Sequence, residues 1–255
     1  MKTIEIKYRP IAFIPVTRTR IGIFPECWSD LTPAQLIAIS HVQDQSLDDF
    51  EFLHQVTGIS RSILKKLAQY QLWELGQGFE WVQEIKPHNK FIIPEINVGD
   101  ARFYAPMDKL KKFQFGQFIF ADSCFSDYQE NKTEEELNRF IASMYLPRGM
   151  EFSDELLEIN TPVISRVPLH AKEAIVLNYF LVKQWLSDVY PLVFQPSKQE
   201  EKPGKTTRSN NNGWIKIFEQ IVGDDIINSD RYATLPLHNV LRFLSDRIKQ
   251  NMKKH

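Results

Sequence analysis

The chain has 255 residues, of which 43% are hydrophobic and 25% are charged, and its formal net charge is −1 at pH 7. These values are typical of folded globular proteins and exclude a disordered, collagen-like or disulfide-framed chain. The near-neutral balance also removes any overall electrostatic attraction to nucleic acid.

The first predicted element is a small β-hairpin at a sheet edge. Ile4 and Ile6 alternate with polar residues, as in a half-buried strand, and residues 20–24 offer a second short strand. Prolines at positions 10 and 15 restrict the pair to an edge. Residues 1–20 hold five basic side chains and one acidic side chain. We interpret them as a solvated strand face; the alternative is a basic arm that contacts a partner.

Short helices are predicted next. Thr32 and Gln35 have the spacing of a capping box, and Gly58 is a typical helix stop. Acidic residues at 48 and 49 favour a helix start, because carboxylates stabilise the positive end of the helix dipole. The expected helices cover residues 33–43, about 48–57, a short stretch after Ser60, and about 71–85, where Gly76 and Gly78 are weak points.

The middle of the chain predicts a second hairpin and a phenylalanine-rich helix. Residues 91–93 and 101–104 flank the turn sequence NVGD, and we expect this hairpin to join the N-terminal strands in one antiparallel sheet. Residues 109–125 contain five phenylalanines at a spacing that suits a helix, although Gly116 weakens it.

Two further helices are expected before position 190. Thr133 and Glu136 form another capping box, and the helix that follows ends at Pro147. An irregular stretch rich in Pro and Ser separates it from the longest helix, at 168–190. That helix is apolar on almost every face, so we expect it to be the central element.

The C-terminal region is predicted to be a helical pair on a linker. Residues 196–213 lack any group that burial would stabilise, so we interpret them as a flexible linker between a main domain at 1–195 and a segment at 214–255. Two short helices cannot cover both of their apolar stripes, so the main body or another chain must do so. The predicted partner-contact residues are Trp214, Phe218, Ile221, Leu237, Leu241 and Leu244.

No motif assigns a chemical activity. Phosphate-binding glycine loops, zinc-protease motifs and nucleophile elbows are absent, so we predict no catalytic residue, no cofactor and no metal ligand. Cys27, Cys124 and His170 are interpreted as packing residues. The sequence also contains two acidic clusters: Asp44, Asp48, Asp49 and Glu51, and Asp122, Asp127, Glu130, Glu134, Glu135 and Glu136. We interpret them as carboxylates at helix starts. The alternative is a divalent-cation site or glycosidic hydrolysis.

Several stretches resemble structural and assembly proteins of tailed bacteriophages and prophages. They are FIFAD at 118–122, LNRFIASMYLPR at 137–148, GWIKIFEQIVGD at 213–224, LPLHNVL at 235–241 and WSDLTPAQL at 28–36. The resemblance implies a role in virion or tail assembly and carries over no active-site residue. Small tail-assembly chaperones are usually shorter and lack the β elements predicted here.

The sequence therefore predicts an α+β protein, mainly helical, with a small antiparallel β-sheet and a linker-tethered C-terminal helical pair. We expect a non-enzymatic protein–protein interaction or assembly protein, in bacteriophage tail or neck morphogenesis. Its expected partners are other protein chains or further copies of itself, with no small-molecule substrate and no membrane. We expect it in the host cytoplasm or in a virion. The alternative is a nucleic-acid-associated accessory protein that uses the basic N- and C-terminal segments, and an enzyme of unrecognised type is third.

Overall fold

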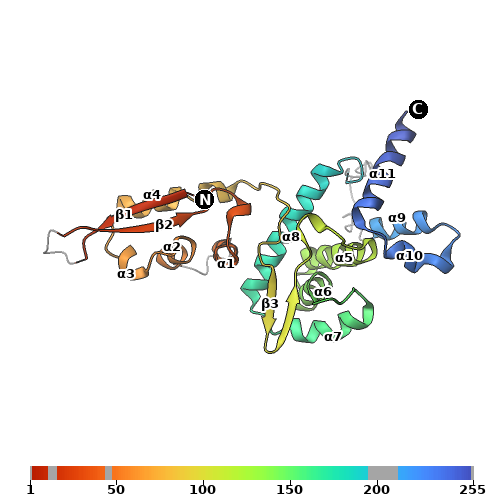
Figure 1. Cartoon of the computed structure of the whole chain (residues 1–255), viewed down its shortest axis with the longest axis horizontal. Coiled ribbons are helices and arrows are strands. Elements are labelled where there is room, and N and C mark those ends of the chain that lie inside the picture. The colour runs from red at the N-terminus through yellow and green to blue at the C-terminus, as the bar shows by residue number, and fades with distance from the viewer. Residues whose placement is uncertain (1, 11–15, 44–47, 195–211, 254–255) are drawn as a thin grey trace, which may run out of the picture. The chain divides into compact units, whose positions relative to one another are not determined.

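The computed structural model describes residues 2–10, 16–43, 48–194 and 212–253 (Figure 1). The chain divides into two compact units: unit 1 comprises residues 1–88 and 169–181, and unit 2 comprises residues 89–168 and 182–255. Within the described ranges there are eleven α-helices and two small antiparallel sheets, which confirms the mainly helical α+β class. Of the predicted linker, residues 196–211 lie outside the described residues.

Unit 1 consists of a hairpin, a helical layer and the first part of the longest helix. The hairpin is confirmed, because β1 (Lys2–Tyr8) pairs antiparallel with β2 (Arg18–Phe24). The helices are α1 (Pro33–Gln43), α2 (Asp49–Thr57), α3 (Arg61–Leu64), α4 (Gln69–Gln77) and residues 169–181 of α8 (Leu169–Val189). Short 3₁₀ helices cover Trp28–Asp30 and Glu80–Gln83.

The start and stop signals of this layer act as predicted. The Thr32 backbone N–H donates to Gln35 Oε1 at 2.9 Å, and the Gln35 N–H donates to Thr32 Oγ1 at 3.3 Å. Gly58 ends α2 at a φ of 70°. The helix predicted at 71–85 is wrong beyond Gln77: a Cβ on Gly78 would lie 2.7 Å from the Phe24 ring, and the chain continues as a 3₁₀ turn. The glycine therefore permits a close approach to β2.

Unit 2 contains the second sheet, in the order β3–β4–β5. Its strands are β3 (Glu95–Val98), β4 (Ala101–Tyr104) and β5 (Leu146–Pro147). The prediction that both hairpins share one sheet is wrong, because β4 pairs with β5, where Phe103 lies opposite Pro147. Residues 91–93 are buried but form no strand.

The helices of unit 2 are α5 (Phe115–Asn131), α6 (Glu134–Met144), α7 (Asp154–Ile164), residues 182–189 of α8, α9 (Asn212–Val222), α10 (Ser229–Ala233) and α11 (Leu237–Met252). The predicted helix at 109–125 begins six residues late, because residues 108–114 form a 3₁₀ turn and a tight loop. The irregular stretch predicted after Pro147 is wrong at α7, whose N-cap is Ser153. Helix 168–190 is confirmed as α8.

Candidate functional site

Two hollows in unit 2 are the candidate sites, and the first is an apolar groove of ≈ 710 Å³ beside α5. We call it the α5 groove. It lies among α5, the N-terminus of α7, α9 and α10. Its apolar lining is Ile119, Phe120, Phe152, Ile215, Phe218 and Ala233. Its charged lining residues are Asp154 and Asp230, so both charges in the lining are negative.

Close packing of α10 against α5 forms one wall of this groove. A Cβ on Gly116 would lie 2.9 Å from the Cβ of Ala233, so α10 approaches α5 as closely as a glycine allows. On the other side, the ring of Phe120 lies 5.4 Å from that of Phe152, and the Arg139 guanidinium lies 5.7 Å from the Phe120 ring. Phe120 and Ile119 remain half-buried, so the groove offers apolar surface to a ligand.

The C-terminal helices are fixed to α5 by a buried polar contact. Trp214 Nε1 donates to Asp122 Oδ2 at 3.0 Å, and Lys183 Nζ lies 2.7 Å from Asp122 Oδ1. The Trp214 ring also meets Phe118 edge to face at 5.0 Å. Since Asp122 is 4% exposed, these two partners help to stabilise its buried carboxylate.

The six predicted partner-contact residues have different surroundings. Leu237 and Leu241 are both 0% exposed, so other residues of the chain already cover them. Trp214, Phe218, Ile221 and Leu244 are half-buried, and Phe218 lines the α5 groove. The structure therefore shows the C-terminal helices packed within their own unit, and leaves one predicted residue, Phe218, on the groove.

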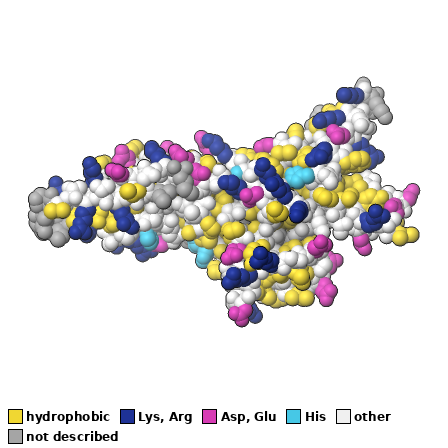
Figure 2. All heavy atoms as spheres, viewed as in Figure 1, with side chains coloured by type: hydrophobic (Ala, Val, Ile, Leu, Met, Phe, Trp, Pro, Cys, Tyr) yellow, Lys and Arg dark blue, Asp and Glu magenta, His cyan; other side chains and the backbone are white. Residues whose placement is uncertain are grey.

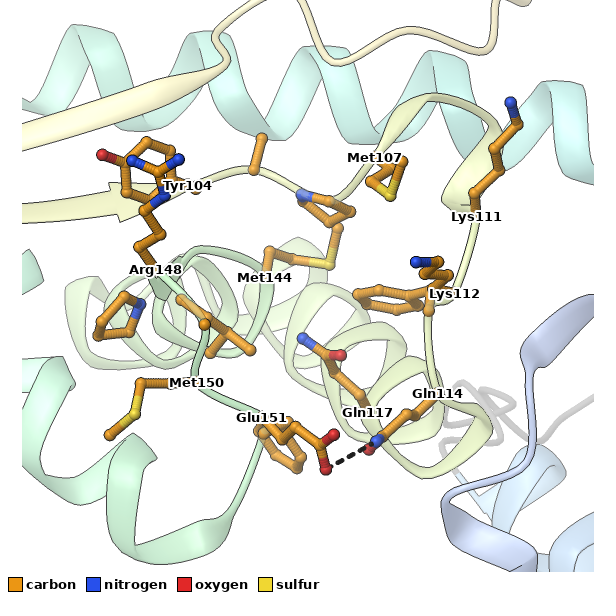
Figure 3. A pocket seen from close by; sticks show the side chains of 17 residues that line it. Tyr104, Met107, Lys111, Lys112, Gln114, Gln117, Met144, Arg148, Met150 and Glu151 are labelled. Carbon is orange, nitrogen blue, oxygen red and sulfur yellow. Dashed lines mark hydrogen bonds between the residues drawn. The ribbon is translucent and has the colours of Figure 1, made fainter.

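The second hollow is a pocket of ≈ 300 Å³ lined by the loop before α5, the end of α6, β4 and the segment after β5 (Figure 3). We call it the basic pocket. Its charged lining residues are Lys111, Lys112, Arg148 and Glu151. In Figure 3 the Lys111 side chain extends away from the other labelled residues, and Arg148 lies on the opposite side of the view from the two lysines. Gln114 Nε2 donates to Glu151 Oε2 at 3.5 Å, so the one acid already has a donor. The two hollows adjoin, because Gln114, Gln117 and Phe152 line both.

The loop that carries the pocket lysines has unusual backbone geometry. Lys109, Leu110 and Lys112 have φ values of 63°, 52° and 60°, in the left-handed region that L-residues other than Asn and Asp rarely occupy. Such conformations cost about 1–3 kcal/mol each and persist where the surrounding structure holds them.

Hydrogen bonds from several segments hold this loop. The Lys109 N–H donates to the Asn89 carbonyl at 2.7 Å, and His238 Nε2 lies 2.6 Å from the Lys109 carbonyl. His238 Nδ1 lies 2.9 Å from the Tyr190 hydroxyl, at the end of α8. Further along, the Leu237 N–H donates to the Phe113 carbonyl at 2.8 Å. The start of α11 therefore fixes one wall of the basic pocket.

The residues considered for chemistry lie apart from both hollows. Burial raises the pKa of Cys124 to about 11, so its thiol is protonated at neutral pH. Cys27 Sγ lies 3.2 Å from Ser29 Oγ. The His170 ring lies 4.7 Å from that of His41, and burial, then the charge of His41, lower the pKa of His170. Within the described ranges no three His, Cys, Asp or Glu side chains are grouped to hold a metal ion.

The carboxylates of the two acidic clusters make different contacts. Asp48 caps α2 by accepting from the Glu51 N–H at 2.7 Å. Glu136 accepts from the Thr133 hydroxyl at 2.7 Å, and this bond lowers the pKa of Glu136. Burial, then the charges of Glu136 and Glu130, raise the pKa of Asp127. The interpretation of carboxylates at helix starts is confirmed for Asp48 at α2 and Glu136 at α6. It is wrong for Asp122, Asp127 and Glu130, which lie within α5 and not in its first turn. Residue 44 lies outside the described residues.

No helix in the described ranges is long and apolar enough to span a lipid bilayer. Comparisons of the chain with protein-family models, with curated protein sequences and with solved structures found no match.

Proposed function

We propose that this chain is a non-enzymatic assembly protein whose α5 groove binds an apolar segment of another protein chain. The observation that carries this proposal is the groove itself, with half-buried Ile119 and Phe120 on one side and Ile215, 42% exposed, on another. An apolar hollow of this size on a folded unit is typical of a surface that another molecule covers. The resemblance to tailed-phage proteins makes tail or neck morphogenesis the proposed setting.

The charges of the groove define the partner further. Asp154 and Asp230 are the charged lining residues, and both are exposed at the rim. A partner segment with apolar side chains at helical spacing and a Lys or Arg at its edge would match both features. Because rim charges are solvated, we expect them to affect association rate and selectivity more than affinity.

Site-specific photo-crosslinking tests this proposal. A photoreactive phenylalanine analogue at position 119 lies in the groove, and the same analogue at position 159 is the control, because Ile159 is 61% exposed on α7 and does not line the groove. In cells that assemble the particle, position 119 should crosslink to a structural protein of that particle, identified by mass spectrometry, and position 159 should not. Equal crosslinking at both positions, or none at 119, would contradict the proposal.

A matched pair of variants gives a second readout. Ile215→Asp places a charge in the groove, and Ile159→Asp places one on the exposed face of α7. We expect particle assembly to be lost only with Ile215→Asp, while both proteins retain the wild-type melting temperature within a few degrees. Assembly that survives Ile215→Asp would refute a role for the groove.

The exposed cations of the N-terminal hairpin favour nucleic-acid association as the second candidate function. Lys2, Lys7, Arg9, Arg18 and Arg20 are all exposed, and Figure 2 shows Lys and Arg side chains along this part of the molecule. Gel shifts with single- and double-stranded DNA at 50 and 200 mM salt test it, because phosphate contacts weaken steeply with salt. Salt-sensitive binding that Arg18→Glu abolishes would support this alternative.

A further inference from the structure

We propose that unit 1 binds an extended peptide segment of a partner protein as an additional strand on the free edge of β1. The segment would lie in a groove of ≈ 460 Å³ between this edge and α4, which we call the β1 groove. This site is separate from the α5 groove, which belongs to unit 2. The inference therefore does not rest on binding in the α5 groove.

The direction of the backbone groups of β1 is the first observation. In the described part of the chain, β1 pairs with β2 in a sheet of two strands, so its other edge pairs with no strand. Gln71 Nε2 of α4 donates to the Lys7 carbonyl at 3.2 Å, which indicates that this carbonyl points away from β2. Backbone groups alternate in direction along a strand, so the N–H and C=O of Thr3 and Glu5 point to the same free edge. Such edge groups are a template for pairing with another chain.

The backbone of β1 lacks the features that commonly block an edge. Natural edge strands are often closed by a bulge, a proline or a covering element. The register of β1 with β2 is continuous over Lys2–Tyr8, and this strand contains no proline. The contact from α4 lies at the Lys7 end, whereas residues 2–6 border the groove. A partner strand can therefore approach the edge along most of its length.

Helix α4 is held beside this edge at both of its ends (Figure 1). At its start, Gln71 Oε1 accepts from the Ala68 N–H at 3.0 Å, and this bond fixes the amide that contacts Lys7. At its end, Gly78 allows a close approach to β2, since a Cβ there would lie 2.7 Å from the Phe24 ring. The groove is therefore already formed in the chain alone, and a preformed groove lowers the ordering cost of binding.

The lining of the groove defines the side chains of the segment. Ile4 is half-buried and Gly78 has no side chain, so apolar side chains of the segment that face α4 have room beside Ile4. The charged lining residues are Lys2, Glu5 and Glu74, all exposed, so carboxylates outnumber ammonium groups. Lys or Arg between the apolar positions of the segment would lie beside Glu5, where opposite charges on neighbouring strands stabilise the pair. Main-chain hydrogen bonds supply affinity in this mode of binding, and alternate side chains supply specificity.

Fluorescence anisotropy with the full chain and a labelled, capped peptide of alternating Val and Lys tests the proposal. We expect saturable binding, with protection of residues 2–8 from hydrogen exchange. Methylation of the peptide nitrogens that face β1 should weaken binding by about tenfold or more, because main-chain donors are lost. A peptide with Glu in place of Lys should also bind more weakly. The Ile215→Asp variant should bind the Val–Lys peptide as the wild type does, which distinguishes this site from the α5 groove.

A matched pair of proline variants tests the edge itself. Thr3→Pro removes an N–H from the free edge of β1. Thr19→Pro makes the same change on β2, where Thr19 lies opposite Lys7, so that its N–H points away from β1. Only Thr3→Pro should weaken binding, by about tenfold or more, while both variants melt within a few degrees of the wild type. If Thr3→Pro fails to fold, Glu5→Lys replaces it and should bind the Val–Glu peptide more tightly than the Val–Lys peptide.

Three results would overturn the proposal. They are no binding of the Val–Lys peptide at millimolar concentration, equal binding of the methylated and unmodified peptides, or wild-type binding by both Thr3→Pro and Glu5→Lys. A dimer that Thr3→Pro dissociates, without any binding of the peptide, would assign the edge to a second copy of the chain and would also overturn it.

Discussion

Replacing Trp214 by Phe should destabilise unit 2 by about 1–2 kcal/mol. The change removes the indole N–H that donates to Asp122 at 3.0 Å, and a hydrogen bond to a charged group contributes about 1.5–3 kcal/mol. The loss lies at the low end because Trp214 is half-buried and Lys183 still pairs with Asp122. Trp214→Ala should cost about 3–4 kcal/mol, since the edge-to-face contact with Phe118 and buried ring area are lost as well.

Urea denaturation followed by circular dichroism measures this loss, and hydrogen exchange of α5 and α9 localises it, because a chain of two units need not unfold in one step. Trp73→Phe is the matched control. Trp73 is 65% exposed in unit 1, so its replacement should change stability by less than about 0.5 kcal/mol. If Trp214→Phe is as stable as Trp73→Phe and leaves exchange in α9 unchanged, the buried contact does not hold the C-terminal helices.

The other expected outcomes concern packing, pH and truncation. Gly116→Ala should lower the free energy of unfolding by about 1–2 kcal/mol, because its Cβ would meet Ala233. Gly76→Ala is the control and should raise that free energy slightly, because the space around Gly76 is open. Chemical denaturation of the two variants and the wild type measures both changes. The folded-state pKa of His170 is lowered, so protonation of His170 opposes folding as the pH falls below about 6.5. Between pH 8 and pH 5 the melting temperature should therefore fall less for His170→Gln than for the wild type. At pH 8 the two melting temperatures should be equal. Deleting residues 196–255 should lower the melting temperature and expose dye-binding apolar surface, because Val222, Leu237, Val240 and Leu241 are buried in the whole chain; an unchanged melting curve would show that the tail contributes nothing to the core.

Helix starts could be predicted because their determinants lie within four residues. Thr32 with Gln35 and Thr133 with Glu136 make the reciprocal bonds that their spacing indicates. A capping box needs no knowledge of the rest of the fold, so the sequence alone is sufficient.

Features that depend on distant partners could not be predicted in this way. Helix α7 was missed because its buried stripe of Leu157, Asn160 and Ile164 contains a polar residue, and Pro162 lies inside the helix. Strand β5 was missed because it is two residues long and contains Pro147. Without β5 there was no reason to separate the two hairpins into different sheets.

The surroundings of the candidate site residues also depend on residues that are distant in the sequence. The apolar stripes of the C-terminal helices correctly indicate that they must be covered, but the pattern does not show that Leu237 and Leu241 are covered within the chain. The basic pocket combines residues from segments up to about 50 positions apart. Its strained lysine, Lys112, gives no sequence signal, because lysine is not a residue that indicates a left-handed backbone.

The division of α8 between the two units has a consequence for the order of events during synthesis. Unit 1 needs residues 169–181, yet residues 89–168, which belong to unit 2, are made before them. At 5–20 residues per second, that intervening stretch takes roughly 4–16 s to translate. Throughout this time the N-terminal hairpin and helices lack the α8 residues of their own core. The nascent residues 1–88 are therefore expected to be a client for chaperones until Leu181 has left the ribosome.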